Sequence, residues 1–208
     1  MIFRDRDDAA RRLAEALAQY RGKNPLVLAI PRGAVEIGAV LAERLGGELD
    51  VVLVRKLRAP GNPEFAIGAV DETGWTYLAD HARHVAGSQG YIEAEKAAQM
   101  EVMRARRASY TPVRPPHDPA GRVVIVVDDG LATGSTMIAA LHALRARQPQ
   151  KLICAVPVAP PDTLEKVTPY ADETVCLSAP ELFYAVGQFY QSFPQVSDAE
   201  VVASLAAD

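Results

Sequence analysis

The sequence lacks long apolar runs, blocks of basic residues and a cysteine pattern. No apolar stretch approaches the ~20 residues that a membrane-spanning helix needs. The net charge is -4, and without a lysine or arginine block it gives no electrostatic basis for binding nucleic acid. The two cysteines, Cys154 and Cys176, each lie in an apolar segment, so we expect buried, reduced thiols rather than a disulfide or a metal site.

Two phosphate-binding motifs are also missing. No lysine follows Gly134, which excludes a Walker A loop, and the sequence contains no Gly-x-Gly-x-x-Gly fingerprint of a dinucleotide site.

The first residues are charged and show no apolar core of a signal peptide, so we expect a cytoplasmic protein without a membrane partner. The composition, 49% hydrophobic and 23% charged over 208 residues, predicts one soluble domain, residues 1–208.

Short apolar runs alternate with helical patterns, which predicts an α/β fold with a parallel central sheet flanked by helices. The predicted strands are residues 26–30, 50–54, 123–127, 152–156 and 173–177. The predicted helices are residues 8–20, 35–45, 135–147 and 162–167, followed by a last helix that opens with the capping box Ser197-Asp198-Ala199-Glu200.

An insertion interrupts this pattern between about residues 57 and 119. Residues 57–64 hold two prolines and a glycine, which predicts an irregular loop, and two apolar runs, 65–70 and 75–78, predict an antiparallel hairpin. Residues 91–110 predict a long charged helix with a thin apolar stripe of Ala97, Met100 and Met103. This helix would serve as a dimer contact or as a solvated arm.

The clearest functional signal follows the strand 123–127. This run is apolar and mostly β-branched, as in a strand buried on both faces, and Asp128 and Asp129 stand at its carboxyl end, where open α/β sheets bind ligands. The loop Thr133-Gly134-Ser135-Thr136 then offers hydroxyls, backbone N–H groups and a helix N-terminus to a phosphate. Ribose hydroxyls, or a Mg²⁺ ion held directly or through water, would relieve the repulsion between the two acids.

Ordinary roles exist for the same residues. Asp128 and Asp129 alone would suit a solvated acidic turn, and Thr133 or Ser135 a simple helix cap. Arg32 and the pair Arg55-Lys56 would each suit a solvated strand end. The acids and the hydroxyl loop occur together after a buried strand, and this combination favours a ligand site.

The run Asp128-Asp129-Gly130-Leu131-Ala132-Thr133-Gly134-Ser135-Thr136 resembles the signature of the type I phosphoribosyltransferases. The resemblance extends to Pro31-Arg32-Gly33, which is similar to the family's pyrophosphate-binding loop, and to Arg55-Lys56, where members often carry a basic residue. It implies the family's sheet with a flap and a small C-terminal hood. It also implies a homodimer that binds 5-phosphoribosyl 1-pyrophosphate and Mg²⁺, and transfers the phosphoribosyl group to a nitrogenous base with release of pyrophosphate.

The resemblance also implies a role for each matched residue. Asp128 and Asp129 would hold the ribose hydroxyls, and Mg²⁺ indirectly, and they form the catalytic set with Arg32. Gly33, Arg55 and Lys56 would face the pyrophosphate. The substrate-binding loop would comprise Gly130, Leu131, Ala132, Thr133, Gly134, Ser135 and Thr136, of which residues 132–136 would cradle the 5-phosphate.

One departure bears on the acceptor. The 6-oxopurine enzymes of the family carry an acid before the Thr-Gly pair, whereas this chain has Ala132, which is more similar to the adenine and orotate enzymes and leaves no general base visible in the loop. Residues 157–160 and the aromatic run 183–190 are candidate acceptor contacts, although the aromatic run would equally anchor the C-terminus. Residues 57–78 would form a flap that excludes water, or an ordinary surface loop.

Two other functions stay open. A regulatory protein that binds the same ligand without catalysis is compatible with Ala132. An acid-pocket phosphohydrolase would need a second acid two residues after a nucleophilic aspartate, but Gly130 and Leu131 occupy those places.

Overall fold

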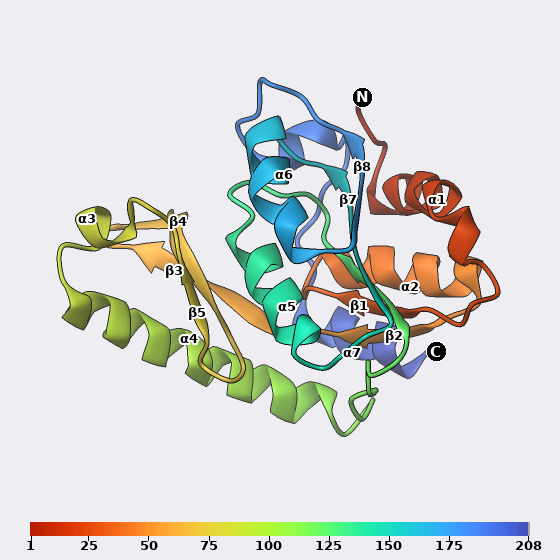
Figure 1. Cartoon of the computed structure of the whole chain (residues 1–208), viewed down its shortest axis with the longest axis horizontal. Helices are drawn as coiled ribbons and strands as arrows, with labels where there is room; N and C mark the ends of the chain where they lie inside the picture. The colour runs from red at the N-terminus through yellow and green to blue at the C-terminus, as the bar shows by residue number, and fades with distance from the viewer. Residues whose placement is uncertain (208) are drawn as a thin grey trace.

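A five-stranded parallel sheet forms the centre of the computed structural model, which describes residues 1–207 (Figure 1). The strand order is β2-β1-β6-β7-β8, and every neighbouring pair is parallel. The strands are β1 (Leu26–Ala29), β2 (Glu48–Val51), β6 (Val123–Val127), β7 (Lys151–Val158) and β8 (Glu173–Ser178). The α/β prediction with a parallel central sheet is therefore confirmed.

Alternate residues of these strands enter two separate cores, because successive side chains point to opposite faces of a sheet. Val27 and Ala29 of β1 pack in the core that includes helices α1 (Arg6–Ala16) and α2 (Ala34–Leu45). Leu26 and Leu28 pack in the core on the other face. The helices of that second face are α5 (Ser135–Arg145) and α6 (Pro161–Val167).

The remaining elements connect or close this framework. Short helical turns are η1 (Ala18–Tyr20), η2 (Thr168–Tyr170) and η3 (Val186–Phe189), and the last helix is α7 (Asp198–Ala206). The predicted capping box opens α7, since Ser197 Oγ accepts from Glu200 N and the Glu200 carboxylate accepts from Ser197 N. Among residues 1–207, no helix has the length and apolar content needed to cross a membrane.

The insertion carries its own antiparallel sheet, which extends away from the central sheet in Figure 1. Its strands are β3 (Val54–Ala59), β4 (Asn62–Asp71) and β5 (Thr76–Leu78), followed by the helices α3 (Ala82–Ala86) and α4 (Gln89–Tyr110). The hairpin between β4 and β5 is confirmed. Trp75, in the turn before β5, stacks on His142 of α5 with ring centroids 3.6 Å apart, so the insertion contacts the second face of the core.

Two expectations for this region are wrong. Residues 57–64 are not an irregular loop: Leu57 is buried within β3, and the chain reverses at Gly61, whose φ of 70° favours glycine, before β4 begins. Pro63 fits because it lies at the start of its strand, opposite a register irregularity in β3. The pair Arg55-Lys56 does not end a parallel strand, because β2 stops at Val51 and the pair lies in β3.

Helix α4 buries part of the predicted stripe and several polar residues beside it. Met103 is buried and Met100 packs half-buried against the core, but Ala97 is exposed. The other buried side chains are Ile92, Glu95, Gln99 and Tyr110. Glu95 and Gln99 lie on this face because Arg58 and Arg55 of β3 are their partners. The Arg58 backbone N, Nε and Nη2 donate to the Glu95 carboxylate over 3.0, 3.1 and 3.0 Å, and Arg55 Nε donates to Gln99 Oε1 over 2.9 Å. A contact of α4 with a second copy stays a prediction.

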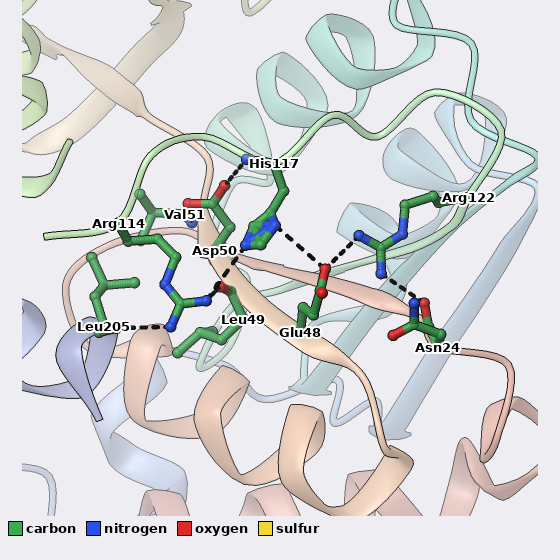
Figure 2. Close-up of polar contacts among 9 residues, drawn as sticks. All are labelled: Asn24, Glu48, Leu49, Asp50, Val51, Arg114, His117, Arg122 and Leu205. Carbon is green, nitrogen blue, oxygen red and sulfur yellow. Dashed lines mark hydrogen bonds and ion pairs between the residues drawn. The ribbon is translucent and has the colours of Figure 1, made fainter. Parts of the chain in front are cut away.

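The segment that follows α4 returns to the edge strand β2 (Figure 2). The His117 backbone N donates to the buried Asp50 carboxylate over 2.8 Å, and Arg122 Nη1 donates to Glu48 over 2.7 Å. His117 Nδ1 lies 3.3 Å from the same Glu48 carboxylate, and Arg114 Nη2 donates to the Leu205 carbonyl over 3.0 Å. These contacts cover the outer edge of the sheet and fix the point at which the insertion ends.

The C-terminal hood segment is anchored to the N-terminus. Phe3 N donates to the Phe189 carbonyl over 2.8 Å, and Phe3, Phe189 and Tyr190 form a small buried cluster. Tyr184, by contrast, is 84% exposed. The aromatic run 183–190 therefore anchors the chain through Phe189 and Tyr190, against which Phe183 also packs, and an acceptor contact by this run stays a prediction.

We expect Glu95→Ala to lower the free energy of unfolding by about 1–3 kcal/mol, because it leaves the Arg58 donors without their buried acceptor. Glu93→Ala, on the exposed face of the same helix, is the matched control and should change stability by less than about 0.5 kcal/mol. Burial raises the pKa of Glu95, but the hydrogen bonds from Arg58 and Gln99 lower it further than burial raises it. The stabilisation is thus present above the ordinary glutamate pKa and is lost as pH falls through the lowered value.

Chemical denaturation of both variants at neutral pH and again at a pH below about 4 tests this contact. Equal losses for Glu95→Ala and Glu93→Ala, or a difference that grows on acidification, would contradict it.

Candidate functional site

A cavity of about 250 Å³ opens at the carboxyl ends of β1 and β6. Three segments enclose it: the loop after β1, the first residues of β3, and the residues that follow β6. Its lining comprises Ile30, Pro31, Arg32, Gly33, Val54, Arg55, Lys56, Asp128, Asp129 and Thr136. The structure therefore brings together the predicted acids, the predicted basic residues and one hydroxyl of the predicted loop.

The acid pair is held by the backbone and by two residues from the chain ends. Asp128 Oδ1 accepts from the Asp129 backbone N over 2.9 Å, and Asp129 Oδ2 accepts from Arg6 Nε over 3.3 Å. The Tyr190 hydroxyl donates to the Asp129 carbonyl over 2.6 Å. Burial raises the pKa of both carboxyls, the charge of Asp129 raises the pKa of Asp128 further, and Arg6 opposes the rise at Asp129. A ligand that donates hydrogen bonds or carries a cation would relieve this repulsion.

Basic residues line the same cavity, and the Lys56 ammonium lies near Glu64, whose carbonyl accepts from Lys56 Nζ over 3.4 Å. Arg32 follows Pro31 through a cis peptide bond, and Arg55 and Lys56 reach the cavity from β3. Burial, followed by repulsion from Arg106, Arg58 and Arg32, lowers the pKa of Arg55. Because these cations repel one another, this side of the cavity favours an anion.

The loop between β6 and α5 contributes less to the cavity wall than the sequence predicts. Leu131 is buried and its N donates to the Val158 carbonyl over 2.9 Å, while the Ala132 carbonyl accepts from Thr163 Oγ1 over 2.7 Å. Ser135 is also buried, whereas Ala132 and Thr133 are exposed. Of residues 130–136, only Thr136 lines the cavity.

Gly130 and Gly134 lie where a side chain would collide with its neighbours. A Cβ on Gly130 would lie 2.7 Å from Val186 Cγ1. Gly134 has a φ of 82°, and a Cβ there would lie 2.9 Å from both Thr163 Cγ2 and Val167 Cγ2 of α6. Contact with α6 and the positive φ therefore both favour glycine at position 134, and the approach of an anion to its backbone stays a prediction.

Sequence reasoning missed two residues that touch this site. Gln99 accepts a hydrogen bond from Arg55 Nε on the buried face of α4. It gave no signal in the sequence, because a polar residue outside the predicted apolar stripe is expected to be exposed. Arg6 lies under the acid pair and is 5% exposed. A weak signal was present for Arg6, since a cation in the first turn of a helix is disfavoured by the helix dipole and therefore needs another reason to be there.

A family model and the curated relatives of this chain agree on one family. The family model described as "Phosphoribosyl transferase domain" matches residues 4–192. A Mycobacterium tuberculosis protein named "Putative phosphoribosyl transferase Rv0571c" is 42% identical over 205 residues, which make up 98% of this chain and 46% of that protein. The chain thus spans about half the length of the curated relatives it matches.

Two solved structures share the fold. The crystal structure of TT1426 from Thermus thermophilus has a TM-score of 0.82 and 49% identity, and the match covers 100% of this chain and 99% of that one. A hypothetical protein from Neisseria gonorrhoeae, solved with bound ppGpp, has a TM-score of 0.52 and 16% identity over 99% of this chain and 95% of that one. At that identity the second likeness concerns the fold alone.

We expect Gly134→Ala to destabilise the protein more than Gly121→Ala does. Both glycines have positive φ, 82° and 68°, so both substitutions carry the same backbone cost of about 1–2 kcal/mol. A Cβ on Gly121 meets nothing within 4 Å, whereas one on Gly134 collides with α6. The difference between the two free energies of unfolding therefore measures the packing of the loop on α6, and equal losses would show that this packing does not constrain Gly134.

Proposed function

Because the chain belongs to the phosphoribosyl transferase domain family, we propose that its cavity binds 5-phosphoribosyl 1-pyrophosphate with Mg²⁺ and that the protein transfers the phosphoribosyl group to a nitrogenous acceptor. One observation carries the proposal. A single cavity is lined by half-buried aspartates together with arginine and lysine residues, next to the first turn of α5. A sugar with hydroxyls at its middle and anions at both ends is complementary to that arrangement.

Each end of the donor has a matching part of the cavity. Asp128 and Asp129 accept hydrogen bonds from the ribose hydroxyls, and Arg32, Arg55 and Lys56 neutralise the pyrophosphate. The 5-phosphate lies at the N-terminus of α5, where Thr136 supplies a hydroxyl and the helix supplies unpaired N–H groups. Residues 132–135 would have to bind this phosphate mainly through their backbone, since only Thr136 of this loop presents its side chain to the cavity.

The reaction requires a good leaving group. The bond between C1 and the pyrophosphate oxygen breaks, its electron pair leaves with pyrophosphate, and a nitrogen of the acceptor forms the new bond to C1 from the opposite face. Arg32, Arg55 and Lys56 stabilise the charge that develops on the leaving oxygen. Asp128 and Asp129 hold the ribose while its ring passes through an oxocarbenium-like state, which their negative charge favours.

The carboxylates of the cavity fit Mg²⁺ only when the ion is part of a complex with the substrate. Within residues 1–207, no group of three or more histidine, cysteine, aspartate or glutamate side chains could hold a metal ion. Two adjacent carboxylates do suit a Mg²⁺ ion whose other ligands are phosphate oxygens and water, which is the usual way proteins bind this ion. When bound in this way, Mg²⁺ would neutralise pyrophosphate charge that the arginines alone leave uncompensated.

A regulatory protein that binds the donor without turnover is the second candidate. Ala132 is exposed at the position where an acid serves the 6-oxopurine enzymes, and its carbonyl is bonded to Thr163, so this position offers no proton acceptor of that kind. The two candidates share one binding site. They differ only in whether the bond between C1 and the pyrophosphate oxygen is broken.

We expect calorimetry to show binding of phosphoribosyl pyrophosphate in the presence of Mg²⁺, and we expect Asp128→Asn and Asp129→Asn each to weaken it roughly tenfold to a hundredfold. Each substitution removes a charged acceptor of a ribose hydroxyl while keeping the side-chain shape. Asp118→Asn, an exposed position away from the cavity, is the control and should bind like the wild type. If the wild-type protein does not bind at millimolar donor, the proposed function fails.

A panel of nitrogenous bases with the donor and Mg²⁺ separates the two candidates. We expect pyrophosphate release with at least one base, and loss of that release in Asp128→Asn. Donor binding with no release across purines, pyrimidines and small amines would favour the regulatory candidate.

A further inference from the structure

Arg6 lies beneath the acid pair and has no part in the proposed function. It belongs to the first turn of α1, far from Asp129 in the sequence, and its Nε lies 3.3 Å from Asp129 Oδ2. The Arg6 side chain is 5% exposed and that of Asp129 is 18% exposed. A guanidinium this deeply buried cannot be a general surface charge, and solvent screens its pairing with Asp129 only weakly.

The rest of the guanidinium is held by Phe193 and Pro194, in the segment between η3 and α7. Arg6 Nη1 donates to the Pro194 carbonyl over 2.6 Å, and its Cζ lies 4.0 Å from the centre of the Phe193 ring. The planar group is thus fixed on one face by the ring and along one edge by a carbonyl. The edge that carries Nε is directed at Asp129.

The loop after β1 closes over this pair. A Cβ on Gly33 would lie 2.6 Å from Asp129 Oδ2 and 2.8 Å from Arg6 Nη2. Gly33 lines the cavity, and its φ of -58° would suit any residue, so a side chain at this point would be opposed only by the two charged groups behind it, which it would have to displace. The backbone that is proposed to face the pyrophosphate therefore rests directly on the Arg6–Asp129 pair.

We propose that Arg6 is a positioning residue for donor binding, a role that rests on the proposed function. By holding Oδ2 of Asp129, Arg6 fixes the carboxylate so that Oδ1 is available to a ribose hydroxyl. It also compensates one of two adjacent negative charges before the donor and its Mg²⁺ arrive. Arg6 acts through Asp129 and does not touch the substrate.

This role explains why helix α1 and residues 190–194 meet at the acid pair. Arg6 comes from the N-terminal helix, whereas Phe193, Pro194 and the Tyr190 hydroxyl on the Asp129 carbonyl come from the C-terminal segment. A purely structural pair would stabilise the fold without affecting which oxygen of Asp129 faces the ligand. The affinity for phosphoribosyl pyrophosphate separates the two roles when variants are compared at a temperature at which all of them are folded.

The experiment titrates phosphoribosyl pyrophosphate with Mg²⁺ into the full chain and its variants by calorimetry, with thermal unfolding recorded for each variant. We expect Arg6→Gln to weaken donor binding roughly tenfold, because Asp129 loses a charge-assisted hydrogen bond. Arg6→Lys should recover part of the affinity, since it restores the charge without the planar group. Arg11→Gln, an exposed arginine of the same helix that pairs with Asp7, should bind like the wild type.

The decisive comparison is made in the Asp129→Asn background. If Arg6 acts through Asp129, Arg6→Gln should change affinity less than about twofold there. Wild-type affinity in Arg6→Gln, equal affinities for the Gln and Lys variants, or an undiminished effect in Asp129→Asn would each overturn the inference. Should Arg6→Gln fail to fold, Phe193→Leu takes its place, since it frees one face of the guanidinium. It should weaken donor binding in the wild-type background and change it less than about twofold in the Asp129→Asn background.

Failure of the inference and failure of the proposed function give different results. No binding by the wild-type chain removes the proposed function. Wild-type binding that the Arg6 variants leave unchanged removes only the positioning role.

Discussion

Two neighbouring carboxylates at the end of a buried strand are the constraint on which the rest of the site depends. A β-strand directs successive side chains to opposite faces, yet Asp128 and Asp129 both reach the cavity because β6 has ended at Val127. Burial and mutual repulsion raise the pKa of Asp128. The backbone N of Asp129 and the buried Arg6 guanidinium offset that cost at the carboxylates, and the Tyr190 hydroxyl holds the Asp129 backbone through its carbonyl.

The parallel sheet and its acid pair were predictable because their signals are local. Five apolar residues followed by two acids describe one strand and its end, and neither depends on a distant partner. The insertion was harder to predict for the opposite reason. Glu95 and Gln99 are buried on α4 only because Arg58 and Arg55 of β3 meet them, and a sequence pattern cannot show that a charged residue has found a buried partner.

The sequence did not show which neighbours the glycines of the site meet. A Cβ on Gly134 would collide with α6, and one on Gly33 would lie 2.6 Å from Asp129 Oδ2 and 2.8 Å from Arg6 Nη2. Arg6 eluded prediction for a related reason, because nothing local ties a residue near the N-terminus to position 129. Residues that support a site without touching its ligand are often remote in sequence, and here the support comes from helix α1 and from residues 190–194.

The stacked contact between Trp75 and His142 gives the insertion an optical label of its own. The chain has one tryptophan, and it lies where the insertion meets α5, with ring planes 9° apart. Its emission therefore depends on a single environment, and any movement of the antiparallel sheet relative to the core would separate the indole from the imidazole. The position of this sheet can thus be followed in solution by intrinsic fluorescence, without adding a dye.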